Sequence, residues 1–475
     1  MNNSTIAAVA TPIGSGGIGI IRISGPKAVS IAESLFQRSR LASNVSSENS
    51  IGNHLGSPDR FKSHHFYHGF IVHPETGQVL DEVLLTAMKA PHSYTREDIV
   101  EIHTHSGRVV MGAVLSSVLR QGARLADPGE FTKRAFLKGR IDLIQAEAVV
   151  DIINAKTDEA LKMATSLIRG GLGKQVESIR ESLVQVLASF EAAIDFPEEA
   201  DEILDAESTL EHIQSQAINA LKKLIEQYDD SHVVRDGLKL VVVGRPNVGK
   251  SSLMNCLVQK DRAIVTSVPG TTRDLIEDHL NIEGIPVIIT DTAGIQETKD
   301  PVEVIGVQKA MEYMGQAGLI LFMVDASSSL LKEDTIIYQQ LKDKPFILVI
   351  NKSDLVDKDF NFEYPRSWGD LPMVKVSALY RHGIELLKTL ILEICTGGKL
   401  PDTDNGIVPN LRHKIALDRC LRSTLAVAEG VRIGRPLELV VIDLNDAIDS
   451  LEGITGATTR EDILDEIFSR FCVGK

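Results

Sequence analysis

The sequence predicts a multidomain protein: an α+β module, a discontinuous α-helical domain, and an α/β block inserted into that helical domain. Three observations carry this prediction. The chain has 475 residues, more than one domain usually holds. Residues 237–398 alternate strand-like and helix-like stretches, the pattern of a parallel sheet. Helical patterning fills 126–236 and returns in 399–475, so we expect these segments to form one domain that follows the module in 1–125.

Composition is ordinary for a globular protein of the cytoplasm. Hydrophobic residues make up 43% of the chain and charged residues 24%. No apolar run has the length of a membrane span, and the N-terminus lacks the basic and apolar regions of a signal peptide. We therefore expect a cytoplasmic protein with no membrane span. The cysteines have no C-x-x-C spacing and are predicted to be reduced thiols: Cys256, Cys395, Cys420 and Cys472.

The net charge of −15 argues against a protein that coats nucleic acid through bulk electrostatics. A local basic segment nevertheless lies between Arg108 and Arg140. Its cations are Arg108, Arg120, Arg124, Lys133, Arg134, Lys138 and Arg140. Such a cluster is most simply a solvated surface, and contact with an anionic ligand is the alternative interpretation.

The N-terminal module, residues 1–125, mixes short apolar runs with turn residues. Strands are expected at 18–24, 66–72, 83–88 and 99–103, and helices at 27–36 and 109–119. Several histidines gather here: His64, His65, His68, His103 and His105. No cysteine or carboxylate set with ligand spacing accompanies them, so we do not predict a metal site.

The next stretch has helical periodicity. Leu143, Ala146, Val150 and Ile153 form an apolar stripe, and we expect that helix to end at Gly170-Gly171. Further helices are expected at 173–196 and 205–228 before the α/β block, and at 412–428, 438–450 and 461–471 after it.

The α/β block opens with a strand at 239–243 and a glycine-rich turn that matches G-x-x-x-x-G-K-[ST] at Gly244, Gly249, Lys250 and Ser251. Glycines let successive backbone N–H groups point at phosphate oxygens, and the helix that follows adds its positive end. Lys250 is expected to reach the β- and γ-phosphates. The Ser251 hydroxyl is expected to ligate Mg²⁺.

Short motifs after the turn, taken together, predict a guanine-nucleotide site. Asn351-Lys352-Ser353-Asp354 follows a strand, so the Asp354 carboxylate can accept both N–H donors of guanine, a pair that adenine does not offer. Asp291-Thr292-Ala293-Gly294 places a carboxylate near Mg²⁺ and a backbone N–H near the γ-phosphate, and Thr272 can complete the Mg²⁺ shell. Ser377-Ala378-Leu379 follows the last strand. The strands expected here are 287–291, 319–325, 346–351 and 373–377. In this order the motifs predict a GTPase.

One position departs from Ras-type GTPases. Their water-orienting glutamine directly follows the DTAG glycine, but here that residue is Ile295, which cannot polarise water. Another group must therefore orient the water. Glu297 and Glu303 are both candidates in the following loop. An arginine finger would need a partner, because no arginine in the sequence is marked for that role.

The chain resembles the MnmE (TrmE) family of tRNA-modification GTPases from end to end. The signatures include Ala10-Thr11-Pro12, GIGIIRISG at 17–25, Pro128-Gly129-Glu130-Phe131, GRPNVGKSSLMN, GTTRD, DTAG, NKSD and the closing Cys472-Val473-Gly474-Lys475. The resemblance implies an N-terminal tetrahydrofolate-binding domain that dimerises, a discontinuous helical domain and an inserted G domain.

The resemblance also implies roles for particular residues. Glu303 would orient the attacking water, and a potassium ion held by Asn247, Thr266, Val268 and Thr271 would replace the arginine finger. The folate ligands would be Arg22, Glu101, Arg140 and Lys475, although Arg22 and Glu101 could equally form a plain ion pair on the strand surface. Arg140 stands where the family is expected to have lysine. Cys472 would be needed for modification but not for GTP hydrolysis, and the alternative is a small buried residue beside Phe471.

The complete set of expected GTP-binding residues combines the motifs with the resemblance. It is Asn247, Val248, Gly249, Lys250, Ser251, Ser252, Thr266, Ser267, Val268, Pro269, Gly270, Thr271, Thr272, Asp291, Thr292, Ala293, Gly294, Asn351, Lys352, Asp354, Ser377, Ala378 and Leu379. Lys250, Glu303 and Cys472 are the expected catalytic residues.

The function that the resemblance implies is potassium-dependent GTP hydrolysis coupled to modification of C5 of the wobble uridine in tRNA. The expected cofactors are GTP, Mg²⁺, K⁺ and 5,10-methylenetetrahydrofolate or 5-formyltetrahydrofolate. The expected partners are a second copy of the chain, the FAD-dependent MnmG protein in a heterotetramer, and tRNA. The basic segment 108–140 could then serve folate or tRNA; we assign Arg140 to folate and leave the others open. The alternative function is an RNA-binding ribosome-assembly or regulatory GTPase without modification chemistry.

Overall fold

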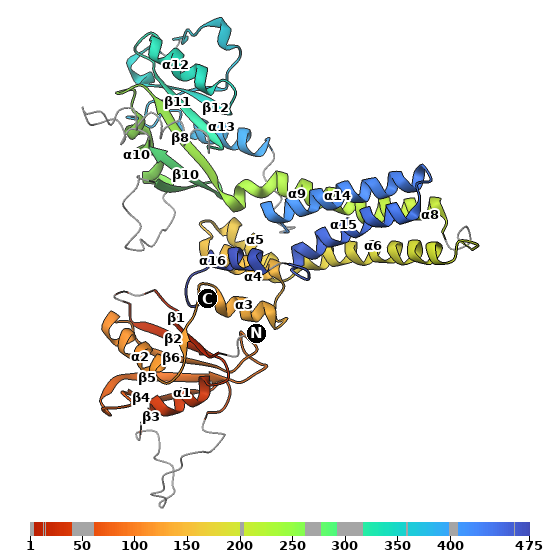
Figure 1. Cartoon of the computed structure of the whole chain (residues 1–475). Helices are drawn as coiled ribbons and strands as arrows, with labels where there is room; N and C mark the ends of the chain where they lie inside the picture. The colour runs from red at the N-terminus through yellow and green to blue at the C-terminus, as the bar shows by residue number, and fades with distance from the viewer. Residues whose placement is uncertain are drawn as a thin grey trace, which may run out of the picture. The chain divides into compact units, whose positions relative to one another are not determined.

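The structure divides into two compact units, one formed by Met1–Val150 with Thr455–Lys475 and the other by Asp151–Ile454. Figure 1 shows the computed structural model of the chain. It describes residues 4–12, 14, 16–39, 61–199, 204–261, 277–291, 317–357, 360–398, 407–459 and 461–475. No helix within these ranges is long and apolar enough to cross a membrane. The domain boundaries at 125, 236 and 398 remain predictions.

The first unit is built on a seven-stranded sheet with the order β3-β4-β5-β6-β2-β1-β7. Helix α1 (Ala28–Leu35) buries apolar residues at helical spacing against it, and α2 (Arg108–Arg120) contacts several of its strands. Both helices enclose one aliphatic core. The strands are β1 (Ile6–Val9), β2 (Ile18–Ser24), β3 (Phe36–Arg38), β4 (Phe66–Val72), β5 (Val79–Met88), β6 (Ile99–His105) and β7 (Arg124–Leu125). The expected α+β module is confirmed.

The two faces of this sheet differ in what covers them. Residues paired across strands share a face, so Ile21 and Ile102 lie together in the helix-covered core. The next pair in the register is Arg22 with Glu101. Because side chains alternate along a strand, this pair lies on the opposite face. That second face also carries large apolar side chains that are exposed: Ile18, Phe66 and Leu84.

Three further helices belong to the first unit: α3 (Glu130–Leu137), the start of α4 (Leu143–Asn154) and α16 (Glu461–Ser469). Leu143 and Ala146 of the predicted stripe are buried against Phe468, but Ile153 is exposed. The predicted helix to Gly170 is in fact two helices. The Thr157 hydroxyl accepts a hydrogen bond from the Ala160 N–H and so starts a new helix, α5 (Asp158–Ile168).

The second unit contains a six-stranded sheet with the order β13-β12-β11-β8-β10-β9. Every pairing is parallel except that of β9 with β10. The predicted strands are confirmed as β8 (Leu238–Gly244), β10 (Ile285–Asp291), β11 (Leu319–Asp325), β12 (Phe346–Asn351) and β13 (Met373–Lys375). Strand β9 (Glu277–Ile282) was not expected, because its sequence EDHLNI lacks an apolar run. Helices α10 (Lys250–Asp261), α12 (Lys332–Leu341) and α13 (Ile384–Thr396) complete this α/β block.

Besides α5, the second unit contains a bundle of helices, and Figure 1 shows them running side by side. They are α6 (Gly171–Asp195), α8 (Ala206–His212), α9 (Asn219–Asp236), α14 (Leu411–Arg432) and α15 (Leu437–Thr455). A π-helical segment, Ile213–Ile218, joins α8 to α9. Helix α9 runs to Asp236, past the predicted end at residue 228. It stops at Gly237, whose φ of +79° turns the chain into β8. The bundle therefore leads directly into the strand that carries the phosphate-binding turn.

Candidate functional site

The phosphate-binding turn begins where β8 ends in the middle of the parallel sheet. Gly244 and Gly249 have φ of +153° and +99°, in the range that favours glycine. A Cβ on Gly249 would come within 2.3 Å of Asn351 Nδ2, and one on Gly244 within 2.5 Å of the Met323 carbonyl oxygen. Only glycine fits at either position, so the backbone can wrap closely in front of α10.

The ammonium group of Lys250 points into the phosphate-binding turn. Lys250 is buried, and its Nζ donates to the carbonyl oxygens of Gly244 and Arg245 at 2.9 Å each. Its neighbour Ser251 is exposed in the first turn of α10. A buried ammonium, a helix N-terminus and a curled glycine backbone together suit a polyphosphate. These residues therefore fit the expected nucleotide phosphates.

Asn351 links the turn to the base-binding loops. Its Nδ2 donates to the Val248 carbonyl oxygen at 2.8 Å, and its Oδ1 accepts from the Ala378 N–H at 3.0 Å. Asp354 stays exposed, and its Oδ1 accepts from the buried Ser377 hydroxyl at 2.5 Å. The hydroxyl fixes how the carboxylate is presented, which is what recognition of two adjacent N–H donors requires.

Lys352 supports the same loop. Its backbone is left-handed, with φ +63°, and its Nζ lies 2.6 Å from Asp325 Oδ2 at the end of β11. Burial raises the pKa of Asp325, but hydrogen bonds from Lys352 and Ser327 outweigh it and leave the pKa below its ordinary value. The ion pair therefore persists at neutral pH and holds the end of β12 against β11.

Several expected residues lie outside the described part of the chain, so their placement stays a prediction. They are Thr266, Ser267, Val268, Pro269, Gly270, Thr271, Thr272, Thr292, Ala293, Gly294, Ile295, Glu297 and Glu303. Asp291 ends β10 beside β8, as its motif predicts. Asn247 is exposed at the tip of the turn with φ +65°.

In the first unit, Arg22 and Glu101 form the ion pair that was one of the two interpretations. Arg22 Nε donates to Glu101 Oε1 at 2.8 Å, and the side chains are only 18% and 17% exposed. The Arg22 guanidinium also lies over the Phe131 ring, 5.6 Å from its centroid. The pair is thus partly enclosed by α3, unlike a solvated strand surface. Burying two charged side chains costs desolvation free energy. Such a pair is found in binding sites as well as in purely structural contacts.

The C-terminal tail joins this pair. Arg22 Nη1 donates to the Gly474 carbonyl oxygen at 3.1 Å. Gly474 has φ +97°, and a Cβ there would approach the Val9 carbonyl oxygen to 2.3 Å, so the tail lies directly on β1. The Cys472 carbonyl oxygen accepts from the Gly129 N–H at 3.4 Å. The Arg22–Glu101 pair is therefore bonded to the tail that ends in Lys475.

Cys472 is exposed, so the interpretation as a small buried residue is wrong, although Phe471 beside it is buried. The structure describes all four cysteines, and the others are at least partly covered. Burial raises the pKa of the Cys395 thiol to about 11 and that of Cys420 to about 12. Cys472 is the cysteine that a reagent or substrate can reach.

Arg140 lies at the edge of the same region. Its guanidinium stacks over the Tyr94 ring, 4.7 Å from the centroid. The Tyr94 hydroxyl is 3.0 Å from the Thr132 hydroxyl on α3, and Tyr94 packs on the cluster that contains Phe131. Tyr94 thus connects Arg140 to the buried cluster over which the Arg22 guanidinium lies.

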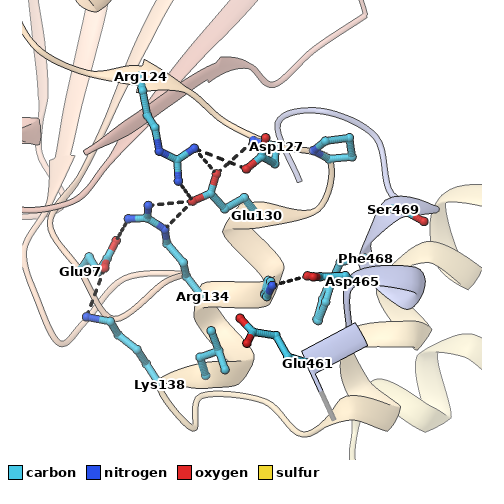
Figure 2. A pocket seen from close by; sticks show the side chains of 13 residues that line it. Glu97, Arg124, Asp127, Glu130, Arg134, Lys138, Glu461, Asp465, Phe468 and Ser469 are labelled. Carbon is cyan, nitrogen blue, oxygen red and sulfur yellow. Dashed lines mark hydrogen bonds and ion pairs between the residues drawn. The ribbon is translucent and has the colours of Figure 1, made fainter. Parts of the chain in front are cut away.

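The basic segment is largely used in ion pairs around a cavity of about 920 Å³ (Figure 2). Arg134 bonds to Glu97 at 2.9 Å and to Glu130 at 2.8 Å, with side chains 10–12% exposed. Arg124 also bonds to Glu130, at 2.5 Å, and Lys138 lies 3.2 Å from Glu97. This charge chain connects α3 to the sheet. Arg124, Arg134 and Lys138 therefore have a structural role in these ion pairs, which explains their presence without a ligand.

Burial raises the pKa values of Glu97 and Glu130, but their partners reverse that effect. Hydrogen bonds from Arg134 to Glu97, and from Arg124 to Glu130, are the largest opposing contributions and leave both pKa values lowered. Carboxylates with lowered folded pKa values stabilise the fold above their ordinary value of 4.5, and this stabilisation is lost as the pH falls through the lowered values. The first unit is therefore expected to lose stability below about pH 4.5.

Replacing Arg134 with methionine should lower the unfolding free energy of the first unit by about 3 kcal/mol, because two mostly buried carboxylates lose a partner. Native-state hydrogen exchange of β1 and α3 amides measures this. Lys133→Met is the matched control, since Lys133 pairs with the exposed Asp465 and should cost about 0.5 kcal/mol or less. Equal losses in both variants would contradict the proposed importance of the buried chain.

Sequence reasoning missed several residues that organise these sites. Arg245 Nε donates to the fully buried Asp334 at 2.8 Å and ties the phosphate-binding turn to α12. His103 lies on the Glu101 face of β6. Its buried Nε2 has no hydrogen-bond partner among the described residues and is 3.7 Å from Glu101 Oε2. Alternation along β6 placed His103 on that face, but nothing in the sequence indicated that β2 would pair with it in this register.

The parallel sheet, the glycine turn with its buried lysine and the Asp354 loop define a P-loop GTPase built into a longer chain. Family models match both sides of this block: "GTP-binding protein TrmE N-terminus" matches residues 5–140, and "MnmE helical domain" matches residues 143–472. The chain belongs to the MnmE family.

Curated relatives agree over the full length. The tRNA modification GTPase MnmE of Carboxydothermus hydrogenoformans is 45% identical over 476 residues, with 100% of both chains covered. That of Alkaliphilus oremlandii is 43% identical, covering 100% of this chain and 99% of the relative. Among solved structures, Aquifex aeolicus Era bound to GDP·AlF4⁻ is 30% identical, covers 39% of this chain and 66% of its own, and has a TM-score of 0.27.

Proposed function

We propose that this chain hydrolyses GTP in a potassium-dependent cycle that drives modification of C5 of the wobble uridine in tRNA, together with the FAD-dependent MnmG protein and with a folate as one-carbon donor. The observation that carries the proposal is the bond from Arg22 to the Gly474 carbonyl oxygen. It connects a partly enclosed Arg–Glu pair to a tail that also bears the accessible Cys472. A regulatory GTPase without modification chemistry gives no reason for this arrangement.

The folate assignment rests on the chemistry of the pair. The 2-amino-4-oxo edge of a pterin offers two adjacent N–H donors, which a carboxylate such as Glu101 can accept. Arg22 orients that carboxylate and partly neutralises it. Phe131 is fully buried and packs against the guanidinium, which helps to hold Arg22 in place. Glu101 and Arg22 fit the pterin edge of a folate, and the folate would supply the one-carbon unit when bound.

A homodimer is proposed through the second face of the N-terminal sheet. Ile18, Phe66 and Leu84 are 64%, 62% and 45% exposed there, and Arg22 and Glu101 share the face. An exposed apolar sheet face rimmed by polar groups is typical of an interaction surface. A Leu84→Asp variant should shift the chain to a monomer in analytical ultracentrifugation; an unchanged dimer would assign the contact to another surface.

Modified-nucleoside analysis tests the function. tRNA from a strain that lacks the gene should lose the wobble C5 modification, and the wild-type chain should restore it. A strain with Cys472→Ser should stay without the modification although purified protein retains its GTPase rate within about twofold, because the exposed thiol is far from the phosphate-binding turn in sequence and lies in the other unit. Normal modification in the deletion strain would favour the regulatory GTPase.

A further inference from the structure

An open groove beside Arg140 is lined by basic side chains. Its volume is about 610 Å³, and its lining residues are His64, Met88, Pro91, His92, Ser93, Tyr94, Arg96 and Arg140. Two of these are arginines and two are histidines, and none is acidic. Both arginines are exposed. A groove with cations and no lining carboxylate suits an anionic ligand.

One lining residue connects the groove to the side chains around the proposed pterin site. Tyr94 lines it and carries Arg140 over its ring. Tyr94 packs in the same cluster as Phe131, which lies under Arg22. Phe131 is fully buried, so the groove and the Arg22–Glu101 pair are connected by resting on one buried cluster. Arg22 is 18% exposed, whereas Arg140 is exposed.

We propose that this groove binds the poly-γ-glutamate tail of the folate, with Arg96 and Arg140 as the carboxylate-binding residues. The inference rests on the proposed folate function and deepens it. The pterin end of a folate needs an enclosed hydrogen-bonding partner, whereas each added glutamate brings a carboxylate that remains well solvated at an open, cationic surface.

Arg96 is positioned for this role. Its backbone is left-handed, with φ +55°, and its Nη1 donates to the Lys138 carbonyl oxygen at 2.8 Å. That contact fixes the guanidinium beside Arg140 and uses one of its five N–H donors. A carboxylate acceptor can take two of the others in the forked geometry that arginine favours.

RNA is the less suitable occupant. Binding to a phosphate backbone commonly neutralises several phosphates in a row. Other cations close to the groove are already paired, since Lys138 bonds to Glu97 and Arg134 to Glu97 and Glu130. Two arginines spaced around one groove match a short flexible polycarboxylate better.

Isothermal titration of the full chain with the monoglutamate and pentaglutamate forms of 5-formyltetrahydrofolate tests the proposal. The wild type should bind the pentaglutamate about five- to tenfold more tightly. Arg96→Gln, which can still donate to the Lys138 carbonyl oxygen, should lose most of this preference and bind the monoglutamate as the wild type does. Arg120→Gln is the matched control, an exposed arginine on α2 outside the groove lining, and should keep the preference.

The outcomes separate the two proposals. Equal affinity of the wild type for both forms would overturn the tail groove and leave the folate site standing, whereas no binding of either form would overturn both. If Arg96→Gln weakened both forms equally, Arg96 would belong to the core site and the tail groove would be wrong. If it instead lowered affinity for tRNA without changing the pentaglutamate preference, the groove would be an RNA contact and this inference would fail.

Discussion

Asp354→Asn should convert the nucleotide site from guanine to xanthine preference, with GTP affinity lowered at least about 100-fold. The carboxylate accepts two N–H groups of guanine, whereas an amide would present a donor to the exocyclic amine. Xanthine has a carbonyl oxygen at that position and accepts the same donor. Because the Ser377 hydroxyl can still bond to Oδ1, the loop should keep its geometry. Competition binding of GTP and XTP measures both effects.

Asp354→Ala is the control for this exchange. It removes acceptor and donor alike, so it should weaken GTP and XTP together. Should Asp354→Asn retain wild-type GTP affinity, base recognition would lie elsewhere, and the bond from Ser377 to Asp354 would be only a loop contact. Weak binding of every nucleotide by the asparagine variant would instead point to a displaced loop.

The α/β block was predictable from sequence because each of its parts depends on local chemistry. A buried parallel strand reads as an apolar β-branched run, and the turn at Gly249 allows no side chain. Strands β11 and β12 therefore have the predicted bounds. Strand β9 was missed because it lies at the edge of the sheet and carries polar residues, so it lacks the apolar run by which the buried strands were recognised.

The site in the first unit depends on contacts between distant residues, which periodicity cannot reveal. Arg22 and Gly474 are 452 positions apart, and their bond exists only because α3 and the tail both lie on the N-terminal strands. The resemblance supplied the residues but not their connection. It also assigned Arg140 to folate but left the other cations of its segment open; their structural role became visible only from the carboxylate partners of Arg124, Arg134 and Lys138.

Replacing K⁺ with Na⁺ should lower the GTPase rate at least about tenfold, because loss of a single electrostatic group that stabilises developing charge commonly costs that much or more. Rb⁺, which is close to K⁺ in size, should restore most of the rate. Asn247 is the described member of the proposed potassium shell, and it lies exposed at the tip of the phosphate-binding turn. Phosphate release measured in each chloride salt, at constant ionic strength, gives the comparison.

Asn247→Gly isolates the contribution of the amide. Asn247 has φ +65°, so alanine would add backbone strain to the loss of the side chain, whereas glycine accepts this conformation and removes only the amide oxygen. The variant should hydrolyse GTP at the same slow rate in K⁺ and Na⁺ and bind GDP within about threefold of the wild type. Full potassium stimulation in Asn247→Gly would remove this residue from the ion's shell. Since the other proposed ligands share the loop at 266–271, stimulation that survives here but disappears in Thr271→Ala would place the ion against that loop alone.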